Sequence, residues 1–84
     1  MPRTAPVMLY MRRDCHLCEQ ARATLLRAAR AERITPEITS IDIDTNPELV
    51  ARYGDRIPVA LLGGAELAWP FTDRQARQAL EATH

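Results

Sequence analysis

The sequence predicts a single α/β domain in which a four-stranded mixed sheet is flanked by helices. Three observations lead to this fold class. Short apolar segments alternate with helix-forming ones, the 84 residues suffice for one hydrophobic core, and a late glycine pair turns one strand back on the next. We therefore expect one domain over residues 1–84, with the element order β-α-β-α-β-β-α.

The first half opens with an apolar segment of strand length. Residues 7–11 follow Pro6 and precede charged residues, which predicts a first strand buried on both faces. Residues 15–33 are rich in alanine, leucine and arginine and lack glycine and proline, a composition that favours a helix. Asp14 stands where an N-cap is expected, and Pro36 requires the helix to have ended before it.

A second strand and a short helix follow. In residues 37–44 isoleucines alternate with aspartates, which predicts a strand whose acidic end is solvated. Asn46 followed by Pro47 is a typical helix start, with a capping residue and a proline at the first helical position. This helix is expected to reach residue 53, because Gly54 is a common stop signal.

The last third of the chain predicts a hairpin and a final helix. Residues 59–62 and 65–69 are strand segments joined by Gly63-Gly64, a pair typical of tight hairpin turns. Thr72-Asp73 supplies caps for a last helix that extends through residue 82. The first two strands, connected through a helix, are expected to be parallel with a right-handed crossover, and the hairpin adds two antiparallel strands.

Charge and composition exclude several classes of function. The chain carries 11 basic and 11 acidic residues, and all the basic ones are arginines that are spread along the chain. Because they form no basic stripe, we expect no nucleic-acid partner. The longest apolar run is far too short to span a membrane, and no secretory leader is recognisable. We therefore expect a cytoplasmic protein without a membrane partner. No exposed apolar stripe requires a second subunit, so we also expect a monomer.

The strongest chemical motif is Cys15-His16-Leu17-Cys18, at the junction of the first strand and the first helix. Only a thiolate attacks disulfides, and unpaired backbone N–H groups at a helix N-terminus stabilise its charge. Cys18 lies one turn further along the same side, where it can pair with Cys15 and resolve a mixed disulfide. The pattern predicts a redox pair, with Cys15 as the nucleophile and Cys18 as the resolving cysteine.

Charged neighbours act on the Cys15 thiolate in opposite directions. Arg12, Arg13 and a protonated His16 would stabilise the negative charge, whereas Asp14 is a like charge that opposes it. The sequence leaves the balance between these effects open.

Two segments, residues 10–18 and 56–59, resemble glutaredoxin-like members of the thioredoxin superfamily, and the element order agrees over nearly the whole chain. The resemblance implies a thioredoxin-like fold and a thiol–disulfide oxidoreductase that acts on protein or glutathione mixed disulfides. It also implies a cis peptide bond between Ile57 and Pro58, with the backbone of Ile57 pairing with an extended substrate.

The same resemblance suggests how glutathione would bind as a co-substrate. Glutaredoxins place a basic residue three positions before the first cysteine to meet a glutathione carboxylate, and Arg12 stands there. His16 and Leu17 replace the usual proline–aromatic pair between the cysteines, and we count them among the substrate-facing residues. The usual late Gly-Gly-Asp motif is absent, because its place falls on Ala68, Trp69, Phe71 and Thr72.

Other interpretations of the cysteine pair stay open. A structural zinc site usually needs four ligands, and beyond the two cysteines only His16 and His84 are suitable soft ligands. We therefore expect no resident metal and no bound cofactor. The alternative function is a non-catalytic binding module of the same fold, such as a carrier of a metal or iron–sulfur cluster. The sequence does not identify the physiological substrate or the electron donor.

Overall fold

The computed structural model describes residues 3–83, and its element order confirms the predicted β-α-β-α-β-β-α. The sheet is mixed, with strand order β2-β1-β3-β4; β1 is parallel to β2 and antiparallel to β3, and β4 is antiparallel to β3. The elements are β1 (Arg3–Met11), α1 (His16–Ala31), β2 (Ile34–Asp42), the 3₁₀ turn η1 (Ile43–Thr45), α2 (Pro47–Tyr53), β3 (Val59–Leu62), β4 (Ala65–Ala68) and α3 (Asp73–Glu81).

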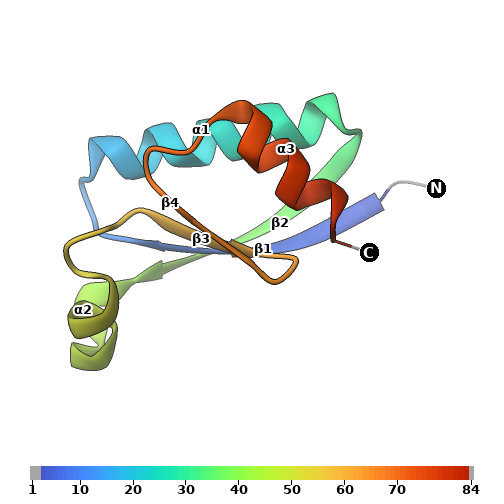
Figure 1. Cartoon of the computed structure of the whole chain (residues 1–84). Helices are drawn as coiled ribbons and strands as arrows, with labels where there is room; N and C mark the ends of the chain where they lie inside the picture. Colours follow the sequence, from blue (N-terminus) through green and yellow to red (C-terminus); the bar gives the residue numbers. More distant parts are fainter. Residues whose placement is uncertain (1–2, 84) are drawn as a thin grey trace.

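The helices are divided unequally between the two faces of the sheet. Helices α1 and α3 pack on one face, whereas α2 lies on the other side at one end of the molecule (Figure 1). The main core fills the space beneath α1 and α3. It is made of small and branched apolar side chains, among them Val7, Leu9, Leu25, Leu62 and Leu80.

The first strand is longer than predicted and is not buried on both faces throughout. It begins at Arg3 and includes Pro6, and its side chains alternate between exposed and buried up to Met8, which is 40% exposed. The prediction was wrong because α2 covers only one end of the second face. Pro6 is tolerated because β3 pairs with β1 only from Met8 to Tyr10, so the strand is open on that side at the proline.

The second strand is displaced toward the N-terminus relative to the prediction. It begins at Ile34, includes Pro36 and ends at Asp42, where residues 37–44 were expected. Proline is acceptable here because β2 is an edge strand. The strand ends at Asp42 because its Oδ1 accepts a hydrogen bond from the Asp44 N–H at 3.0 Å, which starts the turn η1.

The N-cap of helix α1 lies one residue later than predicted. Asp14 has a φ of +52° and is not the N-cap; Cys15 takes that position. The helix ends at Ala31, and Arg33, with a φ of +57°, turns the chain into β2 without a glycine. The predicted cap of α3 is confirmed, since Thr72 and Gln75 form a reciprocal capping box.

A smaller core lies under α2. The rings of Tyr10 and Tyr53 stack with centroids 4.4 Å apart, and Ile43 and Val59 are fully buried beside them. Asn46 caps α2, with its Oδ1 accepting the Glu48 N–H at 2.9 Å. This second core fixes the chain between β2 and β3, which includes the Ile57–Pro58 segment.

Candidate active site

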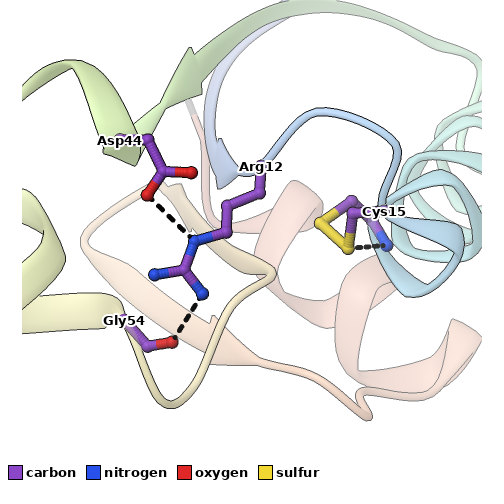
Figure 2. Close-up of a disulfide and its surroundings, with 5 residues drawn as sticks. Arg12, Cys15, Asp44 and Gly54 are labelled. Atoms are coloured by element: carbon purple, nitrogen blue, oxygen red, sulfur yellow. Dashed lines mark hydrogen bonds and ion pairs between the residues drawn. A yellow bond between two sulfur atoms is a disulfide. The ribbon is translucent and has the colours of Figure 1, made fainter.

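The two cysteines of the CxxC motif form a disulfide at the start of α1. Their Cα atoms are 5.2 Å apart, and the pair follows the loop that leaves the end of β1 (Figure 2). Cys18 is buried, with 5% of its surface exposed, whereas Cys15 is partly exposed. The structure therefore places a partly exposed cysteine residue first and a buried one second in the motif.

The sulfur of Cys15 serves as the N-cap of α1. The backbone N–H of Cys18 donates a hydrogen bond to Cys15 Sγ at 3.2 Å, in the position where a serine or aspartate oxygen usually accepts. The partial positive charge of a helix N-terminus lies at the same atom. This arrangement favours negative charge on Cys15 whenever the disulfide is reduced.

The Ile57–Pro58 segment lies beside the start of the cysteine loop, which consists of residues 12–15 between β1 and α1. Its peptide bond is cis, Pro58 is buried, and Ile57 is partly exposed. Val59 pairs with Tyr10 in antiparallel register, which brings the segment before β3 next to the residues that follow β1. Trp69 N–H donates to the Pro58 carbonyl at 3.0 Å and holds that residue from the other side.

Arg12 is occupied by protein groups. Its Nε donates to Asp44 Oδ1 at 3.1 Å and one Nη donates to the Gly54 carbonyl at 3.2 Å. Figure 2 shows the guanidinium between these two acceptors, directed toward them rather than toward the sulfur atoms. The structure therefore places Arg12 near the redox pair but engages its donors with η1 and with the residue after α2.

The other predicted site residues lie around the disulfide on the surface. Arg13 is 85% exposed and its Nε lies 3.5 Å from Asp42 Oδ2. His16 is exposed, with Nε2 3.1 Å from the Gln20 amide nitrogen. Leu17 is 47% exposed, which leaves an apolar side chain in water between the two cysteines.

Sequence reasoning missed the role of the acidic end of β2. Asp42 and Asp44 were interpreted as a solvated strand end, yet each faces an arginine of the cysteine loop. The only sequence signal is the presence of two adjacent arginines and two spaced aspartates after consecutive strands. Because β1 and β2 are parallel, their carboxyl ends lie at the same edge of the sheet, which brings the two arginines close to the two aspartates.

A small hollow of about 110 Å³ lies beside the disulfide, between β1, α1 and β2. Arg22 crosses part of it and donates to Ser40 Oγ at 3.4 Å. Within residues 3–83, no three His, Cys, Asp or Glu side chains gather closely enough to hold a metal ion; His84 lies outside that range. None of the helices in this range is long and apolar enough to cross a bilayer.

Comparison with known proteins agrees with the geometry. The model of the glutaredoxin-like domain family (DUF836) matches residues 6–81. The X-ray structure of Northeast Structural Genomics target protein XcR50 from X. campestris is 40% identical in sequence, with a TM-score of 0.76. The match covers 93% of this chain and 99% of that one. No curated protein matches the chain. A thioredoxin-like sheet, a CxxC disulfide at the first helix and a family match over most of the length lead to one conclusion: the chain belongs to the glutaredoxin-like domain family.

Proposed function

We propose that this protein is a dithiol thiol–disulfide oxidoreductase, with Cys15 as nucleophile and Cys18 as resolving cysteine. The observation that supports it most directly is the hydrogen bond from the Cys18 N–H to Cys15 Sγ at 3.2 Å. A sulfur that caps a helix is stabilised as a thiolate, and the thiolate is the reactive form. The partial exposure of Cys15 and the burial of Cys18 support the same division of roles.

The proposed reaction has two exchange steps. The Cys15 thiolate attacks one sulfur of a substrate disulfide, which forms a mixed disulfide with Cys15 and releases the other substrate thiolate. Cys18, deprotonated, then attacks Cys15 Sγ, which closes the Cys15–Cys18 disulfide and releases the second substrate thiolate. The substrate gains two electrons and the protein dithiol loses them. A thiol reductant such as glutathione returns the pair to the dithiol by the reverse exchange.

The proposed setting is the cytoplasm, where thiols are kept reduced and a CxxC pair can cycle. Protein disulfides and glutathione mixed disulfides are the proposed partners, and the protein is proposed to act as a monomer without a bound cofactor. Ile57 is partly exposed and stands two residues before Val59, which pairs with Tyr10 at the end of β1; this position supports a role in holding an extended substrate chain.

The proposal is tested by measuring the redox equilibrium of the pair in glutathione buffers, with thiol trapping as the readout. We expect a reversible disulfide with a potential between about −180 and −270 mV, the range of known redox domains. We also expect the Cys15 thiol of the reduced protein to react with iodoacetamide with an apparent pKa below the ordinary ~8.5.

Two variants complete this test. Cys15→Ser should abolish mixed-disulfide formation, whereas Cys18→Ser should trap the mixed disulfide on Cys15. Retained exchange activity in Cys15→Ser would contradict the assignment of the nucleophile. A protein that forms no disulfide in the tested buffers, or one far too stable to reduce, would instead favour a non-catalytic binding module.

A further inference from the structure

Arg12 joins three segments that are far apart in the sequence. It lies three residues before Cys15, and it bonds to Asp44 in η1 and to the carbonyl of Gly54, the residue after α2. The arginine side chain is 36% exposed and that of Asp44 is 57% exposed. The guanidinium is therefore partly removed from water and donates two hydrogen bonds to protein acceptors, which Figure 2 marks with dashed lines.

Both arginines that precede Cys15 are paired with carboxylates. Arg12 lies 3.1 Å from Asp44 and Arg13 lies 3.5 Å from Asp42. Apolar surface is also open next to the pair, since Leu17 is 47% exposed and Ile57 is partly exposed, beside the exposed polar side chain of His16. Two arginines already engaged with carboxylates, next to exposed apolar surface, suit a polypeptide better than a small ligand that carries several carboxylates.

We propose that Arg12 is a positioning residue that connects the cysteine loop to the Gly54–Pro58 loop. We also propose that Asp44 neutralises the positive charge of Arg12, so that this charge does not attract anionic ligands. The site therefore selects disulfides within polypeptides over small anionic disulfides. The inference rests on the proposed redox function and adds a substrate class to it. It also reverses the prediction that Arg12 meets a glutathione carboxylate.

The charge part of the proposal is tested with two disulfides that differ only in carboxylate charge, oxidised glutathione and its fully esterified form. Reduced protein is mixed with each, and the second-order rate constants are obtained by thiol trapping without any electron donor. Arg12→Ala should change the ratio of the two constants by less than about twofold. Asp44→Asn, which frees the guanidinium, should raise the ratio about two- to fivefold in favour of glutathione, as expected for a surface ion pair.

A matched control is available in the Arg27–Asp73 pair. Its distance is 3.3 Å, and Asp73 is about as exposed as Asp44, at 55% against 57%, although Arg27 is more exposed than Arg12, at 60% against 36%. Arg27 lies about three helical turns along α1 from the cysteines. Asp73→Asn makes the same change in net charge and should leave the ratio unaltered. An equal rise in both aspartate variants would reduce the effect to net charge and overturn the role of Asp44.

The positioning part needs a readout other than rate. Arg12→Ala loses the bond to Gly54, so amide hydrogen exchange at residues 55–57 should accelerate several-fold; Asp44→Asn keeps that bond and should not show it. Arg12→Lys should restore little, because a single ammonium lacks the planar fork that reaches two acceptors. In the wild-type protein, a short uncharged peptide disulfide should react faster than oxidised glutathione.

The outcomes separate this proposal from the proposed function. A several-fold fall of the ratio in Arg12→Ala would show that Arg12 already binds a carboxylate, and would overturn the inference while leaving the redox function in place. Unaltered exchange at residues 55–57 would overturn the positioning role. Failure of the wild-type protein to react with any of the disulfides would overturn the proposed function, and this inference with it.

Discussion

The two faces of the sheet are built differently. The face under α1 and α3 packs against these helices in one continuous apolar core, in which Leu9, Leu25 and Leu80 are buried. The opposite face is covered only at one end, where Tyr10 stacks on Tyr53, and it leaves Met8 exposed further along. The first face accounts for most of the buried apolar surface, which is the main favourable term in folding.

The sparsely covered face carries the loops of the candidate site. Asp44, Gly54 and the Ile57–Pro58 segment all belong to the chain between β2 and β3, which the smaller core and the two hydrogen bonds of Arg12 fix in place. Stability and site geometry are therefore separable in this fold. The face that holds the domain together is not the face that positions Arg12.

The largest expected effect comes from the continuous core. Leu25 is fully buried under α1, and Leu25→Ala should lower the free energy of unfolding by about 2–5 kcal/mol because it opens a cavity. Leu26, its neighbour on α1, is 43% exposed and supplies the control. Leu26→Ala should change stability by less than about 0.5 kcal/mol in urea unfolding. Similar losses in both variants would contradict the assignment of the core.

The second prediction concerns the aromatic pair under α2. Tyr53→Leu removes the stack of Tyr53 on Tyr10. It also removes the contacts of the Tyr53 ring with Arg52 and Arg56, whose guanidinium carbons lie 5.4 and 5.3 Å from the ring centroid. We expect this change to lower the free energy of unfolding by about 1–2 kcal/mol. Amide exchange should accelerate in α2 more than in α1. A double-mutant cycle with Tyr10→Leu isolates the stack, and a coupling energy near zero would contradict its contribution.

Helix caps allow the two faces to be compared on equal terms. Thr72 caps α3 and Asn46 caps α2, and each accepts a backbone N–H bond of 3.0 and 2.9 Å respectively. Replacing either residue with alanine should cost about 1 kcal/mol. Thr72→Ser retains the hydroxyl and should restore most of the loss. Costs of equal size would show that the faces differ in packing and not in capping; a much larger cost at Thr72 would contradict this.

The smallest effect is pH-dependent and lies at the far end of α1. The Glu81 carboxyl when protonated, and the positive charge of Arg77, lower the pKa of Glu32 below 4.5, while the neighbouring Glu32 carboxylate raises the pKa of Glu81. The contribution of Glu32 to the free energy of unfolding is present above the pKa of Glu32 in the unfolded chain, and it is lost as pH falls through the lowered pKa of the folded state. The Glu81 contribution is present at low pH and is lost as pH rises past its folded pKa.

Glu81→Gln retains a hydrogen-bond donor at every pH. Its stability relative to the wild-type protein should therefore increase between about pH 4 and pH 7, measured by urea unfolding at both values. Glu37→Gln, at an exposed position on β2, is the control and should show no such trend. A stability difference for Glu81→Gln that does not change with pH would rule out the shared proton.

Much of the fold follows from local sequence signals. The helix from Pro47 to Tyr53, the turn at Gly63-Gly64 and the capping box at Thr72 were predicted because each depends on a few adjacent residues. The strand boundaries at Pro6 and Pro36 were wrong. Whether a proline is tolerated in a strand depends on which neighbouring strand pairs there, and that information is not local.

The site was predicted only in part for the same reason. The CxxC pair at the start of a helix was predicted because the motif and the flanking strand and helix are local in the sequence; the burial of Cys18 is known only from the structure. The pairing of Arg12 with Asp44 and with the Gly54 carbonyl spans 32 and 42 residues along the chain. It depends on the parallel register of β1 and β2 and on the path of the chain after α2, neither of which a motif encodes.

The sulfur cap of α1 gives the protein an internal reporter of its own chemistry. Cys15 Sγ, the atom that would form the mixed disulfide with a substrate, also accepts a hydrogen bond from the Cys18 N–H at the start of the helix. Any adduct on Cys15 alters the electron density that this hydrogen bond meets. In the proposed cycle, attack, resolution and release would each change the hydrogen bonding in the first turn of α1, and the amide resonance of Cys18 would register each stage.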